Sequence, residues 1–295
     1  MIIVTHRKIF YIFSSILVIL SLVFLGLRGI NFGSDFTGDA ELEVEFRQTR
    51  PAGDVVAKSV SDAGVHLIAI SEKGGRGYDI RTDYITEEEH VRMVEALSGL
   101  GELDERSFTA VGPSVGRQLR RNALLAIGIA LLAIVLFIAF AFRHVARPVS
   151  SWMYGVVALV ALAHDVIIPT GLFSFLQIQV DSLFVSALLT VLGFSIHDTI
   201  VVFDRVRENL RRAGGAKFEV VVGRSLKETL TRSINTSMTT VLALLAIFFF
   251  GGETTKDFAL ALIVGIVIGT YSSIFIASPL LVTYNSWREG RVGRK

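Results

Sequence analysis

The chain has 295 residues, of which 52% are hydrophobic and 19% charged, and its formal net charge at pH 7 is +2. With several apolar runs of bilayer length, this composition excludes a soluble enzyme and indicates a membrane protein. The small net charge argues against a nucleic-acid partner, and the absence of cysteine excludes disulfides, thiolate metal sites and cysteine nucleophiles. No P-loop pattern is present, and we expect no cofactor and no metal. Any work done by this protein therefore draws on a gradient or on a partner.

Six apolar runs are long enough to cross a bilayer as helices. The first is longer than the apolar part of a usual signal peptide and no cleavage site follows it, so we predict an uncleaved span. The predicted spans are residues 10–27, 123–142, 150–176, 183–203, 234–250 and 258–282. We therefore predict a polytopic α-helical membrane protein with six transmembrane helices.

Basic residues predict the orientation of the chain. They gather in residues 143–147, in residues 205–232 and at both ends, whereas the connections at residues 177–182 and 251–257 together hold a single basic residue, Lys256. The positive-inside rule then places both termini in the cytoplasm. The expected organisation is a first span (1–30), an external domain (31–122), a five-helix membrane domain (123–285) with a cytoplasmic connector (204–231), and a cytoplasmic tail (286–295).

The external segment shows strand and helix patterns in turn. The alternation from Glu41 to Phe46 is typical of a half-buried strand, and Thr86 before three glutamates is typical of a helix N-cap. The predicted elements are strand 41–47, helix 54–63, strand 65–71, strand 78–82, helix 87–97 and strand 104–111. This βαββαβ order predicts a small α+β domain of ferredoxin-like fold. It shows no paired nucleophile and base, so we expect it to contact polypeptide and to move rather than to catalyse.

The most informative stretch is residues 193–209, GFSIHDTIVVFDRVREN, in the fourth span. It places His197 and Asp198 within hydrocarbon, where an aspartate at a helix centre costs about 2.5–3.5 kcal/mol, so this acid is a functional hypothesis. The expected partner of Asp198 is Arg232 at the start of the fifth span, about 5 Å away in depth. The alternatives are a structural interhelical hydrogen bond for Asp198 and a snorkelling, orientation-setting Arg232.

The fourth span also has a polar stripe. Ser186, Thr190, Gly193, His197 and Asp204 fall on one side of a helical wheel, with Asp198 on the flank of this stripe. The opposite, apolar stripe is Val185, Leu189, Leu192, Ile196 and Phe203. We predict that the polar stripe turns toward other helices and the apolar stripe toward lipid. The alternative is that its small and hydroxyl residues only allow close packing.

A second polar pair, His164 and Asp165, lies within the third span. Asp165 is expected about 13 Å further out than Asp198, so a stepwise proton relay is predicted rather than direct pairing. Local capping of a helix that is kinked at Pro169 is the alternative.

Polar residues next to the predicted pair are candidates for support. Asn235 and the run of hydroxyl residues at the start of the fifth span, which includes Ser233, Thr236 and Ser237, either hydrate the pair or bond back to helix carbonyls. His197 either forms a hydrogen bond between helices or carries protons.

In the sixth span, small residues recur every four positions, which predicts a face for close helix packing and no chemistry. They are Ala261, Gly265, Gly269, Ser273 and Ala277.

Four stretches together resemble the SecD/SecF family of the RND superfamily, and specifically the SecF-type accessory subunits of the bacterial Sec translocase. They are residues 31–38 (NFGSDFTG), 111–116 (VGPSVG), 193–209 and 232–240 (RSINTSMTT). The resemblance implies a periplasmic domain, location in the cell inner membrane, a SecD-like six-span partner and a SecYEG-type channel. It also implies that protons are the coupling ion, that the proton motive force promotes late steps of polypeptide export, and that Asp198 and Arg232 are the proton-coupling pair.

Two positions depart from the family pattern. His197 stands where the family usually has asparagine, and Asp39 stands where it usually has glycine, which changes the turn into the first strand.

Three other readings remain open. An RND-type exporter of lipid or small molecules shares the membrane acids but normally has large external domains. An intramembrane aspartyl protease needs Asp165 and Asp198 close together. A passive assembly subunit needs neither acid.

Overall fold

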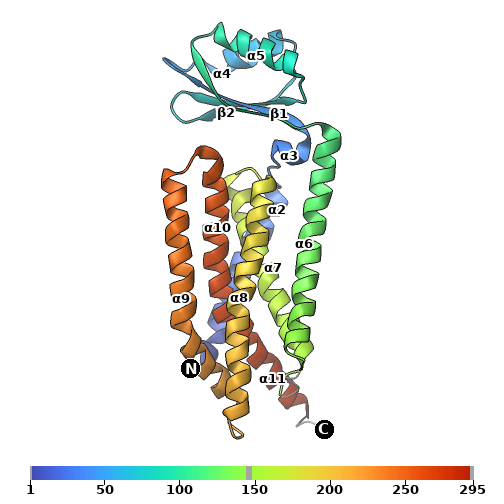
Figure 1. Cartoon of the computed structure of the whole chain (residues 1–295), viewed down its shortest axis with the longest axis vertical. Helices are drawn as coiled ribbons and strands as arrows, with labels where there is room; N and C mark the ends of the chain where they lie inside the picture. The colour runs from blue at the N-terminus through green and yellow to red at the C-terminus, as the bar shows by residue number, and fades with distance from the viewer. Residues whose placement is uncertain (1, 144–147, 293–295) are drawn as a thin grey trace. The chain divides into compact units, whose positions relative to one another are not determined.

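The computed structural model describes residues 2–143 and 148–292. Residues 144–147, in the predicted basic loop, residues 293–295 of the predicted tail and Met1 lie outside that description. The chain divides into two compact units, one of residues 32–124 and one of residues 1–31 with 125–295. We call them the small unit and the helical unit and describe each by itself (Figure 1).

The small unit is a four-stranded sheet with two helices on one face (Figure 1). Its elements are β1 (Asp39–Phe46), α4 (Gly53–Asp62), β2 (Leu67–Lys73), β3 (Gly77–Asp83), α5 (Glu87–Ser98) and β4 (Leu103–Ala110). The strands lie in the order β2-β3-β1-β4, and all neighbouring pairs are antiparallel. The predicted βαββαβ ferredoxin-like fold is therefore confirmed.

The alternation in β1 decides which face of the sheet is covered. Leu42, Val44 and Phe46 point to one side and are fully buried, while the glutamates between them point to the other. The buried face packs on apolar residues of α4 and α5, which are Val56, Val60, Met93 and Leu97. Helix α5 begins at the predicted cap, because Thr86 and Glu89 form a complete capping box.

Two of the short motifs, residues 31–38 and 111–116, meet where the chain enters and leaves the sheet. A short helix, α3 (Ser34–Thr37), ends at Gly38, whose φ of 77° favours glycine. A Cβ on Gly38 would lie 2.5 Å from Pro113 Cα, so the backbones approach too closely for a side chain. The next residue, Asp39, is buried and accepts a hydrogen bond of 2.7 Å from Arg81 Nη2. Asp39, which stands where the family usually has glycine, is thus paired with Arg81.

The helical unit begins with a short helix, α1 (Ile2–Thr5), and contains long helices that follow the predicted spans (Figure 1). They are α2 (Arg7–Arg28), α6 (Pro113–Ala141), α7 (Ser151–Leu176), α8 (Ser182–Arg212), α9 (Phe218–Phe250) and α10 (Glu253–Ser272), which continues through a π-helical turn (Ser273–Ala277) into α11 (Ser278–Val292). In the described residues, six helices are long and apolar enough to cross a membrane. The predicted class, a polytopic helical membrane protein, is confirmed.

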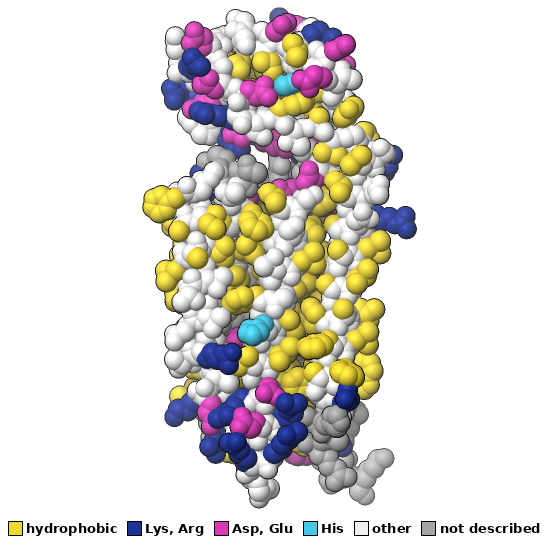
Figure 2. All heavy atoms as spheres, viewed as in Figure 1, with side chains coloured by type: hydrophobic (Ala, Val, Ile, Leu, Met, Phe, Trp, Pro, Cys, Tyr) yellow, Lys and Arg dark blue, Asp and Glu magenta, His cyan; other side chains and the backbone are white. Residues whose placement is uncertain are grey.

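Helices α7 and α8 and the last span, Thr255–Gly290, form the centre of the helical unit. In α7 and α8, 56% of the most apolar stretch is buried, and in the last span 61%, against 6% in α6 and 11% in α2. The outer helices therefore present their apolar side chains outward, as a lipid-facing surface requires, and Figure 2 shows this apolar covering.

Helices α8 and α9 extend well beyond a bilayer. They have 31 and 33 residues, or about 46 and 50 Å, against a hydrocarbon thickness of about 30 Å. The predicted connector 204–231 is therefore mostly two helix extensions joined by a short turn at residues 213–217. Charged side chains gather at this end of the helices (Figure 2).

Candidate functional site

Asp198 lies inside the helical unit on α8 and is 7% exposed. From α9, Ser233 Oγ donates a short hydrogen bond to Asp198 Oδ1. The other carboxylate oxygen, Oδ2, is buried and has no hydrogen-bond partner among the described residues. Because buried polar atoms are nearly always hydrogen-bonded, a buried oxygen without a partner is suited to binding a proton or a water molecule.

The contact expected between Asp198 and Arg232 is not formed, and this corrects the sequence prediction. No ion pair within 4.0 Å joins the two residues in the described part of the chain, and the Arg232 side chain is exposed. Neighbouring residues on a helix point about 100° apart, so Ser233 faces the bundle and Arg232 does not. Arg232 still lies close enough to act electrostatically on the Asp198 carboxylate.

Asp165 lies on α7 and is completely buried. Its Oδ2 accepts hydrogen bonds from Ser195 Oγ of α8 at 2.5 Å and from Ser272 Oγ of α10 at 2.8 Å. His164 Nδ1 lies 3.0 Å from its Oδ1. Three helices thus converge on this carboxylate, and the contact with His164 joins two side chains rather than capping a kinked helix.

The predicted depth of Asp165 relative to Asp198 was wrong. Ser195, which binds Asp165, precedes Asp198 by three residues on α8, or about 4.5 Å of helix rise. The two carboxylates therefore lie about one helical turn apart rather than about 13 Å. Each has its own hydroxyl partners, and no hydrogen bond joins them among the described residues, so the shared proton of an aspartyl protease has no support.

Hydroxyl side chains connect the helices around both acids. Thr199, next to Asp198, is 2.7 Å from Ser273 Oγ, and Ser273 donates to the Ser195 carbonyl at 3.2 Å. Ser237 of α9 lies 2.5 Å from Thr270 Oγ1 of α10. The π-helical turn begins at Ser273, inside this cluster, and such turns often occur at functional sites.

The sequence prediction named the hydroxyl run of the fifth span only as possible hydration, and it missed Ser195 and Thr199, although a signal was present. Ser195 precedes Asp198 by three residues, so helix periodicity puts it near the face of Asp198, and Thr199 follows Ser195 by four residues and shares the face of Ser195. Ser233 and Ser237 are one turn apart at the matching depth of α9. A search for hydroxyl residues at helical spacing around each buried acid finds them.

The predicted orientation of α8 is reversed within this chain. The polar stripe of Ser186, Thr190, Gly193, His197 and Asp204 is exposed. The apolar stripe is buried instead, because it packs on α7 and α10 to form the core. The periodicity identified the two stripes correctly, but their environments are exchanged.

Apart from Ser233, the predicted supporting residues do not contact the carboxylates. Asn235 and Thr236 are exposed on α9, and Thr236 Oγ1 donates to the Arg232 carbonyl at 2.9 Å. His197 is exposed on α8, although it is near enough to interact electrostatically with Asp198. These residues share the exposed face of α8 and α9 with Arg232.

The small residues of α10 lie against α8. A Cβ on Gly265 would be 2.3 Å from Val191 Cγ2, and a Cβ on Gly269 would be 2.9 Å from Ser195 Cβ and 3.6 Å from Asp165 Oδ2. Close approach at Gly269 thus brings Ser195 and the α10 serine to the same carboxylate.

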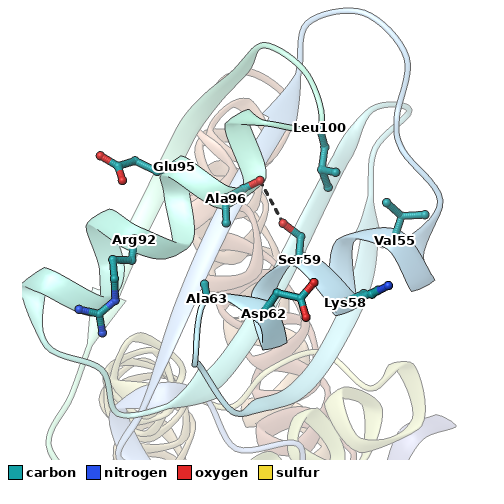
Figure 3. Close-up of a pocket in the computed structure, with 9 residues that line it drawn as sticks. All are labelled: Val55, Lys58, Ser59, Asp62, Ala63, Arg92, Glu95, Ala96 and Leu100. Atoms are coloured by element: carbon teal, nitrogen blue, oxygen red, sulfur yellow. Dashed lines mark hydrogen bonds between the residues drawn. The ribbon is translucent and has the colours of Figure 1, made fainter.

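A hollow of about 690 Å³ lies between α4 and α5 of the small unit (Figure 3). Its rim carries Lys58, Asp62, Arg92 and Glu95, of which Arg92 and Glu95 point away from each other, and Ser59 Oγ donates to the Ala96 carbonyl at 3.0 Å. This lining holds no buried polar group without a partner among the described residues. The buried carboxylates of the helical unit are the stronger candidate site.

Comparison with known proteins shows which family the chain resembles. The family model "Protein export membrane protein SecD/SecF, C-terminal" matches residues 93–287. The chain is 43% identical to protein translocase subunit SecF of Thermobaculum terrenum, over 96% of this chain and 94% of that protein. It is 37% identical to SecF of Haemophilus influenzae, over 98% of this chain and 87% of that protein.

A solved structure also matches. The crystal structure of SecDF, a translocon-associated membrane protein from Thermus thermophilus, superposes with a TM-score of 0.85 at 31% identity. The match covers 96% of this chain but 38% of the SecDF chain, so this chain spans well under half of that relative. A second SecDF structure, in a form called Super-membrane-facing, gives a TM-score of 0.68.

Proposed function

The chain belongs to the SecD/SecF family of protein-export membrane proteins, and we propose that it is a SecF-type subunit that uses the proton motive force to promote late steps of Sec-dependent polypeptide translocation. The proposed coupling ion is the proton, no bound cofactor is needed, and no covalent reaction is catalysed. One observation supports this proposal above the others: Asp198 is buried in a membrane helix with one oxygen bound by Ser233 and the other without a partner among the described residues.

Protonation of Asp198 changes its contacts with α9. The ionised carboxylate accepts a hydrogen bond from Ser233 and attracts Arg232, whereas the neutral acid loses the attraction to Arg232. Both partners lie on α9, so the two protonation states favour different positions of α9 against α8. Moving one charge through 100 mV releases about 2.3 kcal/mol, comparable to the few kcal/mol that separate conformational states.

Asp165 is the proposed second proton-binding residue of the relay. Its carboxylate has three side-chain partners from three helices and is linked to the face of Asp198 through Ser195. A proton that moves between the two acids changes its depth by about three residues of α8, about 4.5 Å. This short step supports the stepwise relay better than the predicted separation did.

The proposed partner is a SecD-like six-span protein that docks on the exposed face of α8 and α9. That face carries His197, Arg232 and Asn235, which are polar groups that lipid does not satisfy. A second membrane half covers them at low cost, as small and polar residues do at helix interfaces. We place the complex in the cell inner membrane with both termini cytoplasmic, next to a SecYEG-type channel, with the small unit in contact with exported polypeptide.

The alternative function is an RND-type proton-driven exporter of lipid or small molecules. It uses the same membrane acids but needs an external substrate cleft. The small unit comprises residues 32–124, and its hollow is an open groove with a charged rim, which suits a small apolar substrate poorly.

A secretion assay under an imposed proton gradient tests the proposed function. Asp198→Asn should abolish gradient-dependent secretion while folding and assembly persist, because the amide fills the same space without titrating. Asp204→Asn is the matched control, since Asp204 lies six residues further along α8 but is exposed and paired with Arg207. A fully active Asp198→Asn, or equal losses in both variants at matched expression, contradicts the proposal and favours a passive assembly subunit.

A further inference from the structure

Three arginines lie close together near the start of α6, in its second and third turns. We call Arg117, Arg120 and Arg121 the α6 arginine cluster. All three residues are exposed, and none forms an ion pair or a hydrogen bond with another described residue. Helix α6 has no acidic residue among its 29 positions, so nothing on this helix balances the three charges.

The α6 arginine cluster lies at the depth of lipid headgroups. The predicted apolar span begins at residue 123 of the same helix, so at 1.5 Å per residue Arg121 and Arg117 lie about 3 and 9 Å beyond its end. The headgroup layer of one leaflet is about 5–8 Å thick, which is half the difference between the whole bilayer and its hydrocarbon core. Guanidinium groups at this depth can reach lipid phosphates.

The cluster also stands on the lipid-facing side of α6. Arg117, Arg121 and Leu125 follow one another at intervals of four residues, so they are neighbours on one face of the helix. Leu124 and Leu125 are 68% and 51% exposed, and only 6% of the most apolar stretch of α6 is buried. A lipid whose chains pack on these leucines therefore has its phosphate beside two guanidinium groups.

The third arginine is held in place by aromatic rings. Arg120 Cζ lies 4.4 Å from the centre of the Phe32 ring, and Phe32 packs edge-on against the buried Phe36, with 6.3 Å between the ring centres. This cation–π contact fixes the plane of the guanidinium group and leaves its N–H donors at the edge of that plane. Donors arranged in this way are suited to the oxygens of a phosphate.

The position of the cluster runs against the positive-inside rule. Three arginines within five residues lie on the side of the first external domain, whereas the other basic clusters mark the cytoplasmic side. Charge on the external side thus does not serve orientation. An interaction with an anion on that side gives it a physical reason.

We propose that the α6 arginine cluster binds the headgroup of an anionic phospholipid in the leaflet that faces away from the cytoplasm. A headgroup with a net negative charge complements three cations that have no acidic partner, whereas a zwitterionic headgroup carries its own cation. Binding fixes the start of α6, where the chain passes from the small unit to the helical unit, at the membrane surface. The choice of leaflet rests on the proposed orientation, but the binding does not depend on proton coupling.

Quenching of a single tryptophan by brominated lipids tests the site. Leu124→Trp places the reporter beside the cluster, and Trp152→Phe with Trp287→Phe removes the two native tryptophans. The full chain is reconstituted with a SecD-like partner without tryptophan, in bilayers that contain brominated phosphatidylglycerol or brominated phosphatidylcholine. We expect the anionic lipid to be enriched about fivefold over the zwitterionic lipid next to the reporter.

Removing the charges should remove the enrichment. With Arg117→Gln and Arg121→Gln together, the ratio should fall to less than about twofold, and insertion should persist because the change agrees with the positive-inside rule. Lys58→Gln with Arg92→Gln is the matched control, since it removes the same charge from the rim of the hollow between α4 and α5 and should leave the enrichment intact.

Three results overturn the inference. They are equal quenching by the two lipids in the parent chain, equal enrichment in the parent and in the paired arginine variant, and enrichment that appears only without the partner. The last result assigns the cluster to a protein interface. Asp198→Asn should leave the enrichment unchanged, so failure of the proposed proton site and failure of the lipid site are distinguishable.

Discussion

The two buried acids differ at the scale of single residues. Asp165 has three side-chain partners, whereas Asp198 has one hydrogen bond and one oxygen without a partner among the described residues. A carboxylate with every site satisfied is held in place, and one with an open site can exchange a proton with little rearrangement. Asp198 is therefore the better candidate for gaining and losing protons, and Asp165 for receiving them in turn.

Ser233→Ala tests the importance of the single hydrogen bond to Asp198. Losing a hydrogen bond to a charged group costs about 1.5–3 kcal/mol, so the balance between ionised and neutral Asp198 should change. We expect gradient-driven secretion to fall markedly and its dependence on pH to shift. Ser237→Ala is the control, because Ser237 lies one turn away and bonds Thr270 rather than a carboxylate. Equal secretion defects in the two variants contradict the assigned role of Ser233.

At the scale of elements, the sheet of the small unit brings three acidic side chains together. Asp79 on β3 lies opposite Glu43 on β1, with Glu41 also beside it. Burial first, and then repulsion by Glu41, raise the pKa of Asp79 to about 7, although Lys73 opposes the shift. Lys73 itself is 2.8 Å from Glu43 Oε2. The β1–β3 pairing is thus most stable when one carboxyl of this group is protonated.

The stability of the small unit should therefore fall as pH rises. The pKa of Asp79 in the folded state, about 7, is higher than its ordinary value of 3.8, so the folded state binds more protons between these values. Asp79→Asn should remove most of this slope and, at pH 8, stabilise the small unit by about 1–3 kcal/mol. Pulse proteolysis in urea at pH 5 and pH 8 measures both effects. Asp62→Asn, at an exposed site, should keep the parental slope, and an unchanged slope in Asp79→Asn refutes the explanation.

At the scale of the whole molecule, the helical unit is unevenly covered. Its outer helices present apolar side chains, but α8 and α9 present a polar face at mid-span. The serine network inside the bundle satisfies one set of polar groups, and the exposed face leaves the other set for a partner. This distribution is expected of one half of a larger membrane assembly.

Gly193→Trp tests the docking face. No atom lies within 4 Å of the position of a Cβ on Gly193, so the ring fits this chain alone but occupies the proposed interface. The amount of SecD-like partner that copurifies in mild detergent should fall at least about tenfold, which corresponds to about 1.4 kcal/mol. Gly128→Trp is the matched control, because Gly128 on α6 has equal space and faces outward among apolar residues. Full partner recovery with Gly193→Trp, or equal losses in both variants, rejects this face.

The sequence by itself determined the elements, the fold class and the family. Hydrophobic run length set the six spans, and the period of two in β1 set which of its residues are buried. These patterns are local, because the length of a helix or the face of a strand depends on neighbouring residues. The βαββαβ order then restricted the sheet to very few arrangements, and the ferredoxin-like one is observed.

Only the tertiary structure decided which groups meet. The wheel of α8 separated a polar from an apolar stripe, but the packing of α7 and α10 decided that the apolar stripe is the buried one. Likewise Asp198 meets Ser233 rather than Arg232, and Asp165 meets Ser195 and Ser272, which lie 30 and 107 residues away. Sequence spacing gives depth along one helix but not rotation about its axis, and a rotation of about 100° exchanges one neighbouring residue for the next. Contacts between helices depend on that rotation, which is set by packing across the whole bundle.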